Sequence, residues 1–128
     1  MEQVQVEKIF DDYYGFDDGV MRAFEYQFSD DGKLNVRIEL YARNHELDGN
    51  VWRRVDVMII DVLESRSIFE PAQFTNIQSK VKLLRFEGEW CVEVNCDFGM
   101  LPISPAVIRK YSKCYVVGRS VEALEFLG

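Results

Sequence analysis

The fold is decided by residues 24–42, which read FEYQFSDDGKLNVRIELYA. After the central turn, every second position is apolar, and these positions are Leu34, Val36, Ile38, Leu40 and Ala42. Before the turn, Phe24, Tyr26 and Phe28 alternate with polar or small residues in the same way. Successive side chains of a strand point to opposite faces, so the pattern predicts two strands with one buried face each. The Asp31-Gly32 step supplies the positive φ of a tight turn, and the segment therefore predicts a β-hairpin.

Further strands are predicted downstream of this hairpin. Val51–Leu63 reads as a third antiparallel strand, and its apolar run on both faces from Met58 to Val62 indicates a central or helix-covered position. Lys80–Phe86 and Trp90–Phe98 flank a Gly88 turn and predict a second hairpin. Its inward row is predicted to consist of Trp90, Val92, Val94, Cys96 and Phe98.

The remaining segments contain the signals for short helices. Glu70–Phe74 has a proline at the first position of a predicted short helix that continues toward Gln78. Ser104 is a predicted N-cap for a helix that runs to Tyr111. Cys114–Val117 is a predicted strand, whereas residues 120–127 fit either a short helix or a further strand.

These elements predict one α+β, mainly β domain over residues 1–128. We expect an antiparallel meander of six to seven strands that forms a curved sheet, sandwich or half-barrel with one or two short helices. Of the 128 residues, 48% are hydrophobic and 29% are charged, which is typical of a globular chain and not of a disordered one.

The ends and the cysteines indicate a cellular compartment. The first seven residues have neither a basic region nor an apolar core, and the longest apolar run is Val57–Ile60. We therefore expect a cytoplasmic protein with no secretory signal and no membrane partner. Three cysteines, Cys91, Cys96 and Cys114, form an odd set that favours free buried thiols.

The sequence lacks the catalytic and ligand-binding motifs of most enzyme classes. The glycines stand singly, so there is no phosphate-binding loop, and His45 is the sole histidine with no nucleophile elbow to serve. Zinc needs four soft ligands, whereas Cys91 and Cys96 would point to opposite faces of a strand. The sequence predicts a protein with no catalytic residues, no metal and no cofactor.

The charge is distributed unevenly. The net charge is −7, and residues 1–31 contain nine acidic and two basic residues, whereas the rest of the chain contains thirteen of each. An acidic chain without a basic block lacks the electrostatic footprint of a nucleic-acid binder. The excess negative charge therefore belongs to the N-terminal quarter.

The segment Phe10–Gly19 is acidic and aromatic, and three interpretations apply to it. Phe10, Tyr13 and Phe16 have the spacing of a helical face that packs on the core. The aspartate pairs could bind a hard cation, although their spacing fits no EF-hand loop. Alternatively, the segment is a protein interface in which tyrosines contact a cationic partner that the carboxylates steer, a surface such as a nuclease toxin presents. The candidate partner-binding residues are Asp11, Asp12, Tyr13, Tyr14, Asp17 and Asp18.

Residues 16–63 carry a resemblance to a known group. Phe16-Asp17-Asp18-Gly19-Val20, the hairpin strands and a third strand led by Trp52 resemble small bacterial β-rich proteins that open with Phe-His-Asp. Some of these are immunity proteins of polymorphic toxin or contact-dependent inhibition systems. Asp17 stands where that group has histidine, so Asp18 is the one residue carried over. The resemblance implies a non-catalytic protein.

The predicted function is that of a non-catalytic protein-binding domain, an immunity-type inhibitor that neutralises a cognate toxin through the N-terminal segment. One alternative is a small-ligand-binding half-barrel whose pocket is lined by Trp52, Trp90 and Phe98. Another is an oligomeric structural module that uses an exposed sheet edge.

Overall fold

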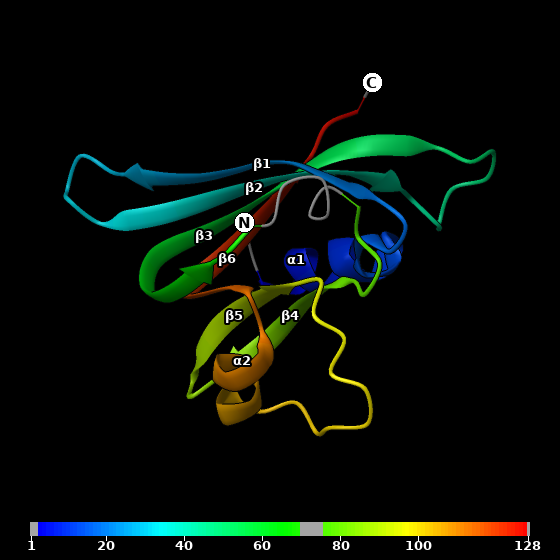
Figure 1. Cartoon of the computed structure of the whole chain (residues 1–128). Helices are drawn as coiled ribbons and strands as arrows, with labels where there is room; N and C mark the ends of the chain where they lie inside the picture. The colour runs from blue at the N-terminus through cyan, green and yellow to red at the C-terminus, as the bar shows by residue number, and fades with distance from the viewer. Residues whose placement is uncertain (1–2, 70–75, 128) are drawn as a thin grey trace.

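The computed structural model describes residues 3–69 and 76–127. Six strands form one antiparallel sheet in the order β1-β2-β3-β6-β5-β4 (Figure 1). The strands are β1 (Val20–Phe28), β2 (Leu34–Arg43), β3 (Trp52–Ser67), β4 (Val81–Phe86), β5 (Glu89–Val94) and β6 (Cys114–Glu125). Two short helices, α1 (Gln3–Asp12) and α2 (Pro105–Tyr111), and a 3-10 turn, η1 (Tyr14–Phe16), accompany the sheet. The predicted mainly β, antiparallel fold is confirmed, and the curved sheet is open.

The predicted first hairpin is present. Phe24 lies opposite Ile38 across β1 and β2, and Gly32 in the connecting turn has a φ of 82°. Val36, Ile38 and Leu40 are completely buried, whereas their neighbours along β2 lie on the outer face. The alternation in the sequence therefore corresponds to the two faces of the sheet.

Strand β3 is longer than predicted, and it contains a bulge. The strand continues to Ser67, and its register with β6 shifts between Val62 and Glu64. Asp61 has a φ of 58°, and its backbone N–H donates to Asn35 Oδ1 at 3.0 Å. A bulge adds a residue to one strand and reverses the inward and outward positions that follow. This reversal ended the apolar alternation that the prediction followed.

Strand β6 occupies the centre of the sheet. It pairs with β3 through Val121 opposite Ile59 and Ala123 opposite Val57, which settles residues 120–125 as strand. Because β6 lies between β3 and β5, the second hairpin continues the sheet outward and leaves β4 at the edge. The sheet is therefore two three-stranded units joined along β3 and β6.

Three local predictions have different outcomes. Residues 70–75 of the helix predicted from Glu70 lie outside the described residues, and its predicted end, residues 76–78, is not helical, since Asn76 forms an isolated bridge with Val20. Strand β5 ends at Val94, so the expected inward row stops before Cys96. The cap of α2 is confirmed, since Ser104 Oγ accepts from Val107 N at 3.2 Å.

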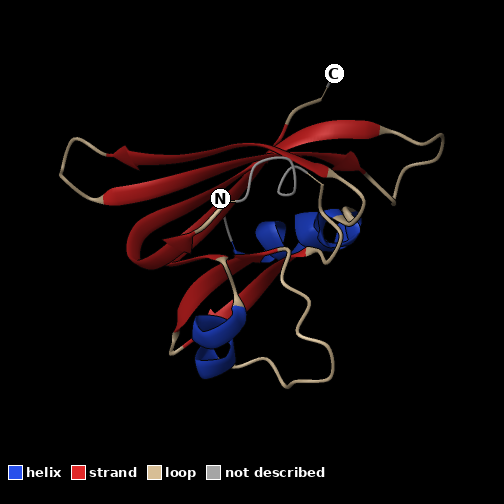
Figure 2. Cartoon of the chain, viewed as in Figure 1, coloured by secondary structure: helices blue, strands red, loops and turns tan. Residues whose placement is uncertain are grey.

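Two apolar clusters hold these elements together. Helix α1 lies within the curve of the sheet (Figures 1 and 2) and contributes to the larger cluster with the inner faces of β2, β3 and β6. Ile108 of α2 caps the smaller cluster, whose other members are Phe86, Cys91, Phe98, Tyr115 and Val117. Strand β5 is buried on both faces, because Val92 belongs to the larger cluster and Cys91 to the smaller.

The three cysteines are free thiols. Cys91 and Cys114 are buried, as predicted, whereas Cys96 is half-buried. Burial raises the pKa of Cys91 and of Cys114 to about 12, so both thiols are protonated at neutral pH. Within the described ranges, neither helix has the length and apolar character needed to cross a membrane.

Candidate functional site

The acidic, aromatic segment is held on the sheet by buried rings. Phe10, Tyr13 and Phe16 are buried, and the Tyr13 and Phe16 rings stack with centroids 5.4 Å apart. Phe10 meets Phe16 edge-on at 5.2 Å. The packing interpretation of the helical spacing is therefore confirmed, and the rings determine where the neighbouring carboxylates lie.

Tyr13 is the deepest anchor of this segment. Its hydroxyl donates to Glu125 Oε2 on β6, which also accepts from Asn44 Nδ2 at 3.2 Å. Burial and the neighbouring carboxylate raise the pKa of Tyr13, so the hydroxyl stays a donor. The prediction had placed Tyr13 among the partner-binding residues, but its side chain is completely buried and offers no surface to a partner.

The aspartates of the segment have different surroundings. Asp11 and Asp18 are exposed, whereas Asp12 and Asp17 are half-buried. Asp12 accepts from Lys8 Nζ at 2.7 Å one turn earlier in α1, so its charge is neutralised locally. Asp18 has a φ of 62°, and its backbone N–H donates to Ile77 O at 2.9 Å. Asp11 and Asp18 thus remain the clearest carriers of exposed negative charge.

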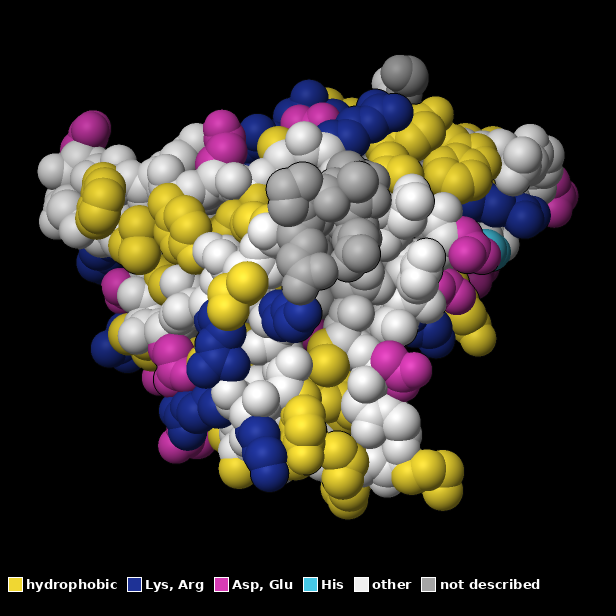
Figure 3. Space-filling model, viewed as in Figure 1, with side chains coloured by type: hydrophobic (Ala, Val, Ile, Leu, Met, Phe, Trp, Pro, Cys, Tyr) yellow, Lys and Arg dark blue, Asp and Glu magenta, His cyan; other side chains and the backbone are white. Residues whose placement is uncertain are grey.

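The structure divides the negative charge of the first 31 residues among separate places. Glu25 accepts from Arg37 Nε at 2.6 Å on the outer face of the sheet. Asp30 and Asp31 lie in the turn between β1 and β2, at the far end of that hairpin (Figure 1). Figure 3 shows other acidic side chains gathered beside the histidine, near the end of α1. The charge excess is therefore not a single site, and its α1 part, Glu7 and Asp11, lines a groove.

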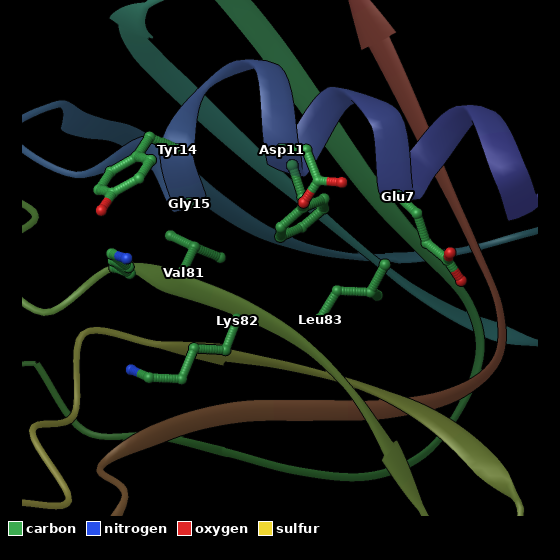
Figure 4. A pocket seen from close by; sticks show the side chains of 9 residues that line it. Glu7, Asp11, Tyr14, Gly15, Val81, Lys82 and Leu83 are labelled. Atoms are coloured by element: carbon green, nitrogen blue, oxygen red, sulfur yellow. The ribbon is translucent and has the colours of Figure 1, made fainter. Parts of the chain in front are cut away.

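That groove lies between α1 and β4, has a volume of about 450 Å³ and is named here the α1–β4 groove (Figure 4). Its walls are formed by Glu7, Phe10, Asp11, Tyr14, Gly15, Lys80, Val81, Lys82 and Leu83. Glu7 and Asp11 are four residues apart and so share one face of the helix. Val81 and Leu83 supply the apolar wall from β4.

One end of the groove is closed by an aromatic and cationic contact. Tyr14 is 57% exposed, and Lys80 Nζ lies 4.0 Å from the centroid of its ring. Gly15 lets the Lys80 stem lie against the backbone, because a Cβ there would stand 3.0 Å from the Lys80 Cβ. The centroid of the His45 ring lies 5.7 Å from that of the Tyr14 ring.

The backbone around this end is conformationally costly. Four residues other than glycine have positive φ, between 52° and 65°, and these are Tyr14, Phe16, Asp18 and Lys80. Such conformations cost on the order of 1 kcal/mol each and accumulate at ligand-binding and catalytic sites. Their clustering at the groove favours a functional role for it.

The electrostatics of the groove are asymmetric. Glu7 and Asp11 are exposed and form no ion pair with any residue that the structure describes. Lys82 is engaged away from the groove, since its Nζ lies 3.2 Å from Glu93 Oε1 and donates to two backbone carbonyls. The α1 wall is thus acidic, and Lys80 places one positive charge at the Tyr14 end.

Glu93 is a buried carboxylate that holds this side of the sheet. Ser112 Oγ donates to its Oε2 at 2.7 Å and Cys96 N at 3.1 Å, in addition to Lys82 at Oε1. Burial raises the pKa of Glu93, and these donors oppose that rise. Because its oxygens are satisfied by protein groups, we assign Glu93 a structural role.

The aromatic residues proposed for a ligand pocket are in different surroundings. Trp52 packs against Tyr41 with ring centroids 5.5 Å apart, and Trp90 lies beneath the Arg85 guanidinium at 4.2 Å. Phe98 lines a second groove of about 340 Å³. The three rings therefore do not line a common pocket.

Five of the groove residues lie outside the segment that the sequence singles out, and these are Glu7, Lys80, Val81, Lys82 and Leu83. Glu7 was detectable, because its four-residue spacing from Asp11 places both on one face once the helix is extended backward. Residues 80–83 come from the edge strand β4 and the residue that precedes it, far from α1 in the sequence, and no local pattern connects them to α1.

The described residues contain no group of three or more histidine, cysteine, aspartate or glutamate side chains arranged to bind a metal ion. Comparison of the chain with protein-family models, with curated proteins and with solved structures gave no match. The α1–β4 groove and the carboxylates around it are thus the features from which a function can be argued.

Proposed function

We propose that this chain is a non-catalytic protein-binding domain of the immunity type, which neutralises a cognate toxin in the cytoplasm. The observation that carries the proposal is the display of exposed Asp11, Asp18 and Tyr14 on a segment anchored by buried rings. Because buried rings hold this segment on the sheet, the carboxylates are pre-organised and lose little entropy when a partner binds.

The expected partner presents a basic surface to these residues. Exposed carboxylates raise the association rate with a cationic surface and make it dependent on salt. Tyr14 adds an exposed aromatic ring, the residue type that contributes most energy at the centre of protein interfaces. An enzyme that binds nucleic acid has such a basic surface at its active site, and covering that surface blocks it.

The test uses the proteins encoded by the genes that flank this one. Each is produced in a bacterial host with and without this chain, and growth and direct binding are measured. We expect one flanking protein to be toxic alone, to be neutralised by this chain, and to bind it with an affinity that falls as salt increases.

A charge-matched pair of variants gives the comparison its specificity. Asp11→Asn with Asp18→Asn removes two exposed charges at the proposed interface, and asparagine tolerates the positive φ of Asp18. Asp30→Asn with Asp48→Asn removes two exposed charges in the turns that follow β1 and β2, outside the segment that carries Asp11 and Asp18. We expect the first pair to weaken binding about tenfold and the second to leave it unchanged. Equal effects of the two pairs would refute the proposed interface.

A further inference from the structure

Strand β4 is an edge strand with one partner. It pairs with β5 from Val81 to Phe86, and no strand lies on its other side in the described sheet. Over the described ranges, the outward backbone groups of residues 81–86 make no hydrogen bonds. An exposed edge of this kind can accept an extended chain as an additional strand.

The charged side chains that usually protect an edge strand point away from the free edge of β4. Edge strands are commonly guarded by lysines or other charges that repel an incoming strand. Here Lys82 reaches back to Glu93 at 3.2 Å, and Arg85 stacks over Trp90 at 4.2 Å and donates to Gly88 O at 2.7 Å. Both cations are thereby committed to contacts within the second hairpin.

The α1–β4 groove runs beside this edge. Tyr14 contacts Lys80 at one end, and Figure 4 shows Glu7 projecting from α1 above Leu83 toward the other. Helix and strand thus border the groove together, with carboxylates on one side and apolar side chains on the other. An extended segment in the groove would meet both.

The spacing of the two carboxylates fits an extended chain. Residues four apart on a helix have Cβ atoms about 6 Å apart, which applies to Glu7 and Asp11. Alternate side chains on one face of a strand repeat at about 6.7 Å. Two basic side chains at alternate positions of a strand can therefore reach Glu7 and Asp11 together.

We propose that the α1–β4 groove receives an extended segment of a partner protein, which adds to β4 as a seventh strand and places two basic side chains on Glu7 and Asp11. This inference rests on the proposed function and specifies how the partner is recognised. Main-chain hydrogen bonds along β4 supply affinity, and the carboxylates select the basic side chains.

The test uses a fluorescein-labelled peptide, Thr-Val-Lys-Val-Lys-Val-Thr, and two controls. In one control, glutamate replaces both lysines, and in the other, alternate amides are N-methylated so that they cannot donate to an edge strand. Fluorescence anisotropy gives the affinities, and amide chemical shifts of the intact chain locate the binding site. We expect the lysine peptide to shift residues of β4 and α1 and both controls to bind at least about fivefold more weakly.

Variants of the chain provide the complementary control. Glu7→Gln with Asp11→Asn should weaken the lysine peptide about fivefold, whereas Asp30→Asn with Asp48→Asn should not change its affinity. Equal binding of the N-methylated peptide, shifts confined to β1, or a dimer of this chain that pairs through β4 would each overturn the inference. A separate result would contradict the proposed function, namely that a cognate partner binds Asp11→Asn with Asp18→Asn as tightly as it binds the native chain.

Discussion

Replacing Tyr13 by phenylalanine removes one hydroxyl from the anchor of the N-terminal segment and leaves its ring in place. That hydroxyl donates to Glu125 and is buried. A hydrogen bond to a charged acceptor contributes about 1.5 to 3 kcal/mol to stability. Glu125 keeps two other partners, Asn44 at 3.2 Å and Arg53 at 3.5 Å, so its carboxylate is not left unpaired. We therefore expect Tyr13→Phe to lower the free energy of unfolding by about 1.5 kcal/mol, the lower end of that range.

The assay is urea and thermal unfolding at neutral pH. For a chain of this length, 1.5 kcal/mol corresponds to a fall in the melting temperature of about 6 °C. Tyr111→Phe is the matched control, because that hydroxyl is on an exposed ring and its loss should cost under about 0.5 kcal/mol. A double-mutant cycle with Glu125→Gln should give a coupling of about 1 kcal/mol. A Tyr13→Phe protein as stable as the control would refute the assignment of Tyr13 as the anchor.

Three further predictions concern other parts of the fold. Gly118→Ala should cost about 2 kcal/mol in chemical denaturation, because the added Cβ would stand 2.5 Å from Ile59 Cγ2, and an unchanged stability would contradict this packing. Ser104→Ala should cost about 1 kcal/mol through loss of the α2 cap, whereas Ser104→Asp should restore most of it. Burial and the Glu64 carboxylate raise the pKa of Tyr115 to about 12. The stabilising contribution of Tyr115 is present below the unfolded pKa of about 10 and is lost as pH rises toward 12. Between these pH values, the free energy of unfolding of Tyr115→Phe should therefore fall less steeply with pH than that of the native chain.

Local patterns were sufficient for the hairpins of this fold. The alternation over residues 24–42 and the Asp-Gly turn specify face, strand and turn within one short window. Residues 120–125 belong to an eight-residue stretch, 120–127, that was ambiguous, because its apolar residues at Val121, Ala123 and Leu124 satisfy both the helical and the strand period. Only pairing with β3, more than 60 residues earlier in the chain, settles them as strand.

The bulge in β3 shows a second limit. Asp61 adopts a positive φ, and its backbone N–H donates a hydrogen bond to the Asn35 side chain on β2. This contact depends on the pairing of β2 and β3. A single sequence does not reveal where such a residue will be inserted. The predicted strand therefore ended where its alternation ended, at Leu63, although β3 continues to Ser67.

For the candidate site, the sequence indicated the segment and not its geometry. Tyr13 and Tyr14 are adjacent and chemically identical, yet one is buried against β6 and the other is exposed beside Lys80. The helical spacing of Phe10, Tyr13 and Phe16 places Tyr13 on the packed face and leaves Tyr14 off it. The groove itself required β4, which long-range topology brings to α1.

The most direct test of the proposed function is the salt dependence of association with a flanking-gene product that the growth test finds toxic. Stopped-flow association rates are measured at several ionic strengths for the native chain, Asp11→Asn with Asp18→Asn, and Asp30→Asn with Asp48→Asn. We predict that the association rate falls as salt rises, that the first variant pair flattens this dependence, and that the second retains it. Identical salt dependence in all three proteins would contradict the claim that the N-terminal carboxylates meet the partner.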